Sequence, residues 1–184
     1  MPTTSRSRRA DATRNFTRVL EAAFEVFSEQ GTSAPISAIA ERAGVGAGTI
    51  YRHFPTKEDL FRAVVADRFQ AMVDHGRGLL ASEPGGEALF DFLRVLIAGG
   101  TENHALADAI IGSEFDVMEA ESPFLEVLGD LLRTAQESGR VRTDIGVMEV
   151  KALLGACYLV RSYGEEYVEP MMRVVFDGLR TVAR

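Results

Sequence analysis

Hydrophobic residues recur along this chain at intervals of three and four, which is the period of an amphipathic helix. The first such stripe predicts a helix over residues 11–31. Two short helices are predicted over 35–44 and 47–54, and a long helix begins after Thr56, where Asp59 is placed to complete a capping box. The remaining helical segments cover residues 88–100, 104–120, 123–139, 147–164 and 165–183. Because no alternating strand pattern is found, we predict an all-α fold of about nine helices.

The same pattern divides the chain into three parts. Residues 1–10 are basic and carry no apolar stripe, so we expect a disordered arm. Residues 11–56 form a three-helix front end, and residues 57–184 form a longer helical bundle. No apolar run approaches the ~20 residues that cross a bilayer, and the arm lacks the apolar stretch of a secretory signal. With a single cysteine, Cys157, that cannot form an internal disulfide, we expect a cytoplasmic protein that does not contact the membrane.

Charge is distributed unevenly between these parts. The formal net charge is −7, which by itself would repel phosphate. Residues 1–57, however, hold eight Lys and Arg against five Asp and Glu, whereas the rest of the chain holds twelve against twenty-two. The positive end is where a polyanion could bind, although a charged stretch is more often only a solvated surface.

The two short helices, joined by a tight turn, have the form of a helix-turn-helix, whose second helix enters the major groove of DNA. Gly44 permits the turn, and Ile50 and Phe54, four residues apart, are expected to face inward. The small residues beside them would let the backbone approach the duplex closely. The free N–H groups at the starts of the first short helix and of the long helix are suited to bind phosphate. The positions left outside are Ala47, Gly48, Thr49, Tyr51, Arg52 and His53.

The stretch "GVGAGTIYRHFPTKEDL", with "ISAIAERAG" and "AAFEVFSEQG" before it, resembles the DNA-binding domain of the TetR family of bacterial transcriptional regulators over about residues 12–62. The resemblance implies an N-terminal DNA reader and a helical C-terminal domain that dimerises. It also implies, in most cases, a small-molecule pocket in that domain and repression that a ligand relieves. The expected partners are a palindromic double-stranded DNA operator, a second copy of the chain and a small-molecule effector.

The resemblance also implies which residues contact DNA. Because Ala47 and Gly48 stand where many relatives carry longer side chains, direct base readout is expected to be sparse, with shape and water carrying more of the specificity. Tyr51 could instead pack in the core, and Arg52 could simply pair with Glu41. The DNA contacts implied by the family pattern are Ser37, Arg42, Ala47, Gly48, Thr49, Tyr51, His53 and Lys57.

The C-terminal part offers candidates for a ligand pocket and for a dimer interface. Five residues could line a pocket, although plain core or solvated surface is the alternative for each: Phe92, His104, Glu114, Phe115 and Met118. The last two helices carry more apolar surface than one inward stripe needs, and the family pairs these helices with their symmetry mates. The interface predicted on this basis contains Val150, Leu154, Cys157, Met171, Val175 and Leu179.

Two other functions remain open at this point. A dimeric DNA-binding regulator without a ligand has the same sequence features, and a closed cavity among the middle helices would separate the two. An enzyme built on a helical bundle would need a nucleophile–base pair, an HExxH motif or a glycine-rich phosphate loop, and none is found. The three histidines lack metal-ligand spacing. We expect neither catalysis, nor a cofactor, nor a metal site. If a ligand binds, movement is expected at Gly99–Gly100 and Pro84–Gly86.

Overall fold

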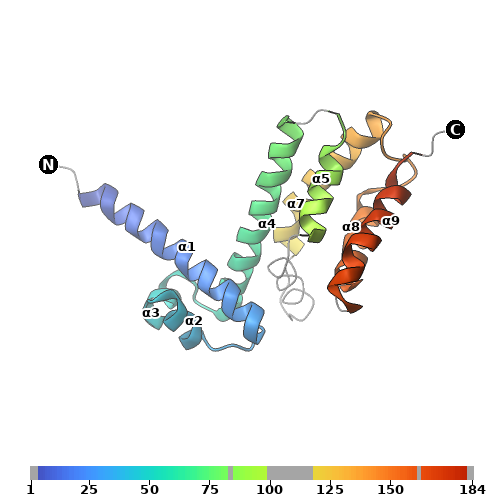
Figure 1. Cartoon of the computed structure of the whole chain (residues 1–184). Coiled ribbons are helices and arrows are strands. Elements are labelled where there is room, and N and C mark those ends of the chain that lie inside the picture. Colours follow the sequence, from blue (N-terminus) through green and yellow to red (C-terminus); the bar gives the residue numbers. More distant parts are fainter. Residues whose placement is uncertain (1–3, 83–84, 99–117, 161–162, 182–184) are drawn as a thin grey trace. The chain divides into compact units, whose positions relative to one another are not determined.

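A computed structural model describes residues 4–82, 85–98, 118–160 and 163–181 (Figure 1). All the regular elements in these ranges are helical, and the one β-type contact there is an isolated bridge between Val141 and Arg180. The predicted all-α class is therefore confirmed. The elements are α1 (Thr4–Gln30), α2 (Ile36–Ala43), α3 (Ala47–His53), α4 (Lys57–Ser82), α5 (Ala88–Ala98), α7 (Met118–Glu137), α8 (Val147–Val160), the 3₁₀ helix η2 (Glu165–Tyr167) and α9 (Val168–Leu179).

The first helix begins earlier than the hydrophobic pattern predicts. α1 starts at Thr4, so the expectation of a disordered arm over residues 1–10 is wrong for residues 4–10. These residues include three arginines and an alanine, which are good helix formers, and each residue added to an existing helix gains a backbone hydrogen bond. Residues 4–10 carry no apolar stripe, which is why the hydrophobic pattern did not reveal this part of the helix.

The chain forms two compact units, and α4 contributes to both. The described part of the first unit comprises α1 to α3, α4 as far as Arg68 and residues 118–120 of α7, so it extends past the boundary predicted at residue 56. The reason is that the first turns of α4 belong to the same core: Phe61 is buried and meets Phe27 of α1 edge to face, with 5.5 Å between ring centroids. Five further core residues of this unit are fully shielded from solvent, namely Ala23, Ile39, Ile50, Leu60 and Val65.

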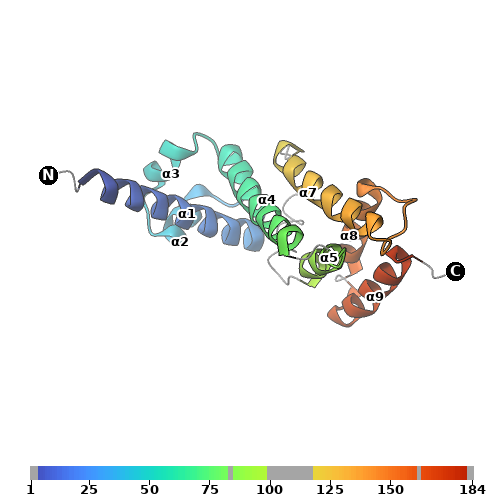
Figure 2. The ribbon, with the colours of Figure 1, turned by 90° about the horizontal axis from the view of Figure 1, so that it is seen from above.

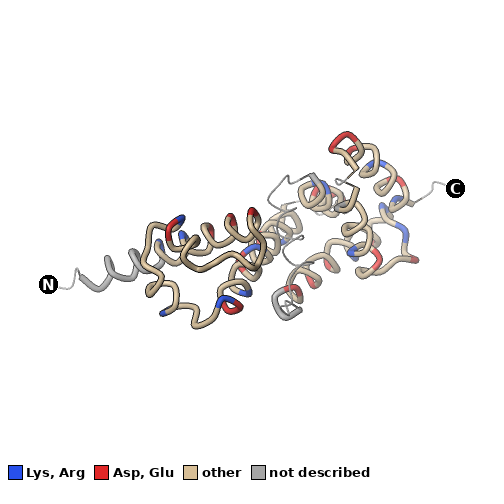
Figure 3. The backbone as a smooth tube through the Cα atoms, turned by 90° about the horizontal axis from the view of Figure 1, so that it is seen from below, with Lys and Arg blue, Asp and Glu red and all other residues tan. Residues whose placement is uncertain are grey.

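The second unit contains the rest of α4, α5, α7 from Glu121, α8 and α9. α8 and α9 pack against each other and against α5 (Figure 2). Aromatic rings fill the interior: Phe92 stacks on His75, and Phe90 meets Phe176 at 5.4 Å between centroids. Pro170 lies in the first turn of α9. From Glu121 onward α7 carries four acidic residues and one basic residue, whereas α5 and α8 each carry one of either sign (Figure 3).

One glycine allows a close contact among three helices of this unit. A Cβ built on Gly76 of α4 would lie 2.5 Å from Val127 Cγ1 of α7 and 3.1 Å from Phe92 Cε2 of α5. Real Cβ atoms do not approach other carbon atoms so closely. The absence of a side chain at Gly76 therefore lets α4 pack directly on α5 and α7.

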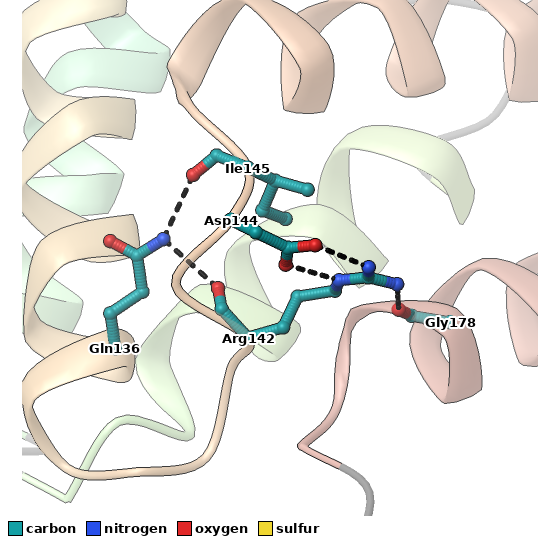
Figure 4. Close-up of polar contacts among 5 residues, drawn as sticks. All are labelled: Gln136, Arg142, Asp144, Ile145 and Gly178. Atoms are coloured by element: carbon teal, nitrogen blue, oxygen red, sulfur yellow. Dashed lines mark hydrogen bonds and ion pairs between the residues drawn. The ribbon is translucent and has the colours of Figure 1, made fainter.

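The connection from α7 to α8 holds the end of α9 in place. The Arg142 N–H donates to the Leu179 carbonyl at 3.0 Å, and the Thr181 N–H donates to the Arg140 carbonyl at 3.1 Å. The Arg142 guanidinium pairs with Asp144 and reaches the carbonyl of Gly178, whereas Gln136 donates to two carbonyls of the same connection (Figure 4). We call residues 138–146 with residues 178–181 the clasp.

The clasp also holds the start of α5. Arg140 Nε donates to the Gly85 carbonyl at 2.7 Å, and the Arg140 guanidinium pairs with Glu87. Gly86 is buried with φ +82°, and a Cβ there would lie 2.2 Å from Ser138 Oγ. Residues 85 and 86, part of the segment where movement was expected, are thus bound and tightly packed. Pro84 and Gly99–Gly100 lie outside the described residues.

Candidate nucleic-acid interface

The turn between α2 and α3 has the backbone geometry that its glycines predict. Gly44 ends α2 with φ +65° and ψ +37°, a left-handed conformation that glycine adopts without strain. Its N–H donates to the Glu41 carbonyl at 3.1 Å, and the Val45 N–H donates to the Ala40 carbonyl at 3.0 Å. α3 then begins after Gly46. The two helices are thus joined by only three residues, as in a helix-turn-helix.

α3 buries one face and exposes the other, as predicted. Ile50 and Phe54 are buried, which anchors the helix in the core of the first unit. Tyr51 is 50 % exposed, so the structure favours a surface position over the alternative in the core. Of the other predicted contacts, Gly48 and His53 are exposed, and Ala47 and Thr49 are half-buried. The residues of α3 that were predicted to face DNA are therefore all at least partly accessible.

His53 is exposed but is also held by aromatic neighbours. Its ring lies edge-on to Phe16 of α1, with 5.9 Å between centroids, and 6.3 Å from Phe54. Phe16 in turn lies 5.4 Å from Phe54. These contacts fix the last turn of α3 on α1. The position of His53 is therefore set by packing as well as by its place on the helix.

The start of α4 has the predicted capping box. The Thr56 backbone N–H donates to Asp59 Oδ2 at 3.0 Å, and the Asp59 N–H donates to Thr56 Oγ1 at 3.0 Å. Asp59 and Glu58 thus place negative charge at the positive end of the helix. Lys57, the first residue of α4, is the cation that a phosphate would meet at this helix start. Its Nζ donates to the Ala34 carbonyl at 3.5 Å.

The two predicted contacts on α2 differ in their surroundings. Ser37 is exposed in the first turn, where the N-cap residue, Pro35, makes no side-chain hydrogen bond to the helix. Arg42, in contrast, is engaged within the protein: it donates to Glu25 Oε2 at 2.9 Å and to Glu29 Oε2 at 2.8 Å. These hydrogen bonds, above all the one to Glu29, raise the pKa of Arg42, and Arg42 lowers the pKa of Glu29. Arg42 and Glu29 are therefore both ionised at neutral pH.

Of the five candidates for a ligand pocket, the structure describes the side chain of one. Phe92 is buried in the second unit, where its ring lies 6.1 Å from that of Phe124. Phe92 therefore occupies a core position, which was the alternative to lining a ligand pocket. Met118 is the first residue of α7, and the other three candidates, His104, Glu114 and Phe115, lie outside the described residues.

The residues predicted for the dimer interface differ in their exposure within the protomer. Val150, Cys157 and Leu179 are buried within the protomer and have almost no surface to offer a partner, so the prediction is wrong for these three. These three residues lie on the inward stripes of α8 and α9. Burial also raises the pKa of the Cys157 thiol. Leu154 and Val175 are half-buried, whereas Met171 is exposed together with large apolar residues that the prediction missed, namely Met148, Leu159, Tyr163, Tyr167 and Val174.

Comparison with known proteins identifies the class. Residues 19–64 match the family described as bacterial regulatory proteins, tetR family, and residues 83–181 match the C-terminal domain of SbtR-like transcriptional regulators. The chain belongs to the TetR family of transcriptional regulators, which confirms the resemblance seen in its sequence. Its helix-turn-helix is the DNA-binding element of that family.

Individual relatives agree with this assignment. The TetR transcription regulatory protein from Mycobacterium vanbaalenii is 46 % identical, with a TM-score of 0.72 over 94 % of this chain and 99 % of that one. A TetR regulator from Streptomyces coelicolor is 35 % identical, with a TM-score of 0.71 over 91 % and 99 %. The HTH-type transcriptional regulator SrpR of Pseudomonas putida is 28 % identical over 165 residues, which cover 79 % of this chain and 75 % of SrpR. Within the described ranges, no helix has an apolar stretch long enough to cross a membrane.

Gly48 offers a direct test of close backbone approach to DNA. A Cβ at this position would meet no atom within 4 Å, so Gly48→Ala leaves the packing intact and favours the helix by up to ~1 kcal/mol. We expect unchanged or higher thermal stability but weaker operator binding, by about tenfold, because the added methyl group occupies the space of the duplex. Anisotropy titration with labelled operator measures this. Gly78→Ala, at an equally open position on α4, is the control, and equal affinity of the two variants would contradict close approach at Gly48.

Proposed function

We propose that this protein is a homodimeric repressor that binds a palindromic operator and is released from it by a small molecule. The observation that carries the proposal is the surface of α3, where buried Ile50 and Phe54 fix the helix and Tyr51 stands out into solvent. This arrangement fits insertion into the major groove, with the first turn of the helix nearest the bases. Lys57, at the start of α4, supplies a phosphate contact beside it.

The apolar surface of α8 and α9 supports a dimer. Val174 is 67 % exposed and Leu159 is 61 % exposed, which is unusual for large aliphatic side chains on consecutive helices. Gly155 and Ala156 are also exposed on α8 and would allow close approach of a partner helix. A two-fold axis makes such a surface self-complementary. It would also place two α3 helices on half-sites about 34–36 Å apart, or a multiple of that distance.

Proteins of the same fold support a small-molecule effector. The regulator FadR from Bacillus subtilis was solved in complex with stearoyl-CoA, with a TM-score of 0.71 at 18 % identity. A gamma-butyrolactone receptor has a TM-score of 0.69 at 22 % identity. We infer a ligand for this chain by analogy with these proteins. A compound library screened against the protein–operator complex tests it, and the expected hit weakens operator binding by about 5- to 150-fold.

The DNA contacts are tested on an operator obtained by genome-wide selection of bound fragments. Lys57→Ala should weaken binding to all sequences and lower the slope of log K against log salt by about one, because one phosphate contact is lost. Tyr51→Ala should weaken operator binding without unfolding the protein. Arg133→Ala is the control, since it removes an exposed cation that pairs with Asp130 of its own helix. If Lys57→Ala and Tyr51→Ala both bind like this control, the placement of α3 in the groove is wrong.

A further inference from the structure

Arg42 forms a fork of hydrogen bonds between α2 and α1. Its Nη1 donates to Glu25 Oε2 at 2.9 Å and to Glu29 Oε1 at 3.1 Å, and its Nη2 donates to Glu29 Oε2 at 2.8 Å. The two glutamates are four residues apart on α1 and therefore lie on the same face. We propose that Arg42 is a positioning residue for DNA binding: it clamps α2 onto α1, and so sets the recognition helix, instead of contacting phosphate.

A second contact joins the same end of α2 to α1, and here the arginine lies on α1. Arg18 of α1 donates from Nη2 to the carbonyl of Ala43, the last residue of α2, at 2.6 Å. The same Nη2 lies 3.0 Å from where a Cβ on Gly44 would stand. Each helix thus contributes one arginine to the other. Both contacts fall within two residues of the turn that leads into α3, so a shift of α2 on α1 would shift the recognition helix.

The charges around Arg42 argue against a phosphate contact. Glu25 and Glu29 together carry two negative charges against its one positive charge, so the cluster as a whole repels a phosphate. The two terminal nitrogens of Arg42 both donate to these carboxylates, and a phosphate would have to displace them. Isolated surface ion pairs contribute little, but a bidentate arginine shared by two carboxylates is the geometry that can hold two elements in register.

Removing the carboxylates distinguishes a clamp from a phosphate contact. Glu25→Gln with Glu29→Gln breaks the clamp and removes two negative charges from the DNA-binding unit. The control, Glu21→Gln with Glu41→Gln, removes two charges from exposed positions on the same helices. Fewer negative charges favour DNA, so the control should bind operator as tightly as the wild type or more tightly. The clamp variant should bind about three- to tenfold more weakly than the control. If it binds equally or more tightly, the proposal is overturned.

Salt dependence and a conservative variant give independent readouts. Arg42→Ala should lower operator affinity about three- to tenfold with an unchanged salt slope, whereas Lys57→Ala lowers the slope by about one. Arg42→Lys keeps the charge but cannot form the fork, so it should behave like Arg42→Ala. A slope lowered by one in Arg42→Ala, or full affinity in Arg42→Lys, would identify a phosphate contact and overturn the proposal. Circular dichroism of each full-length variant at the assay temperature confirms that the affinities compare folded proteins.

Discussion

Val174→Asp is expected to separate the two protomers and to abolish tight operator binding. Val174 is exposed in the middle of α9, so a carboxylate there costs the isolated protomer little. In a two-fold dimer through α8 and α9, the same substitution buries two charges against an apolar surface. A monomer presents one recognition helix and loses the second half-site. Operator affinity should then fall by about a hundredfold or more, with the melting temperature of the protomer nearly unchanged.

Sedimentation of this variant decides where the interface lies. Val95→Asp is the matched control, because Val95 is also an exposed valine, 47 % accessible, but on α5. This control should remain dimeric. If Val174→Asp sediments as a dimer, the exposed surface of α8 and α9 is not the interface. A charge at Leu154 or Val175 is a less specific test, because both residues are half-buried in the protomer and a charge there would also disturb its core.

Gly76→Ala is expected to destabilise the second unit by about 1–3 kcal/mol or more. The new methyl group would overlap Val127 of α7 and press on Phe92 of α5, two residues of the buried core. α4 can accept it only by moving away from both helices, which opens the interior of the unit. Urea unfolding followed by circular dichroism measures the loss as a lower midpoint at an unchanged slope.

Gly78→Ala in the same helix separates this packing effect from helix propensity. A Cβ at Gly78 would meet no atom within 4 Å, so this variant gains the helix propensity of alanine without a clash. It should be more stable than the wild type by up to ~1 kcal/mol. Equal stability of the two variants would show that α4 does not pack as closely on α5 and α7 as the structure indicates.

Local patterns predicted the helices and their ends, because helix periodicity, caps and glycine turns are properties of neighbouring residues. The capping box at Thr56 and Asp59 and the left-handed turn at Gly44 are examples. The start of α1 at Thr4 was not predicted, since residues 4–10 lack the apolar stripe that the prediction used. Pro123 was expected to begin a helix, because proline is favoured at the first helical position, but α7 starts at Met118 and continues through it.

Contacts between distant residues could not be predicted in this way. α8 and α9 are apolar on more than one face, so the sequence could not tell that Val150 and Cys157 lie inside and Met148 and Val174 outside. Arg42 and Glu29 lie thirteen residues apart in the chain, and their pairing depends on how α2 crosses α1. In both cases the residue types were informative, but their partners follow only from the tertiary structure.

The clasp has a consequence for the order in which the two units fold during synthesis. In the first unit, the contacts among α1, α2, α3 and the start of α4 join residues that are all made before Phe69. In the second unit, residues 139–142 bond to residues 178–181, almost the last of the 184. Contacts of such long sequence separation form late. The DNA-reading helices can therefore fold while the ribosome is still translating, whereas the second unit can close only after residues 178–181 have been made, so its apolar helices spend a longer time exposed to aggregation.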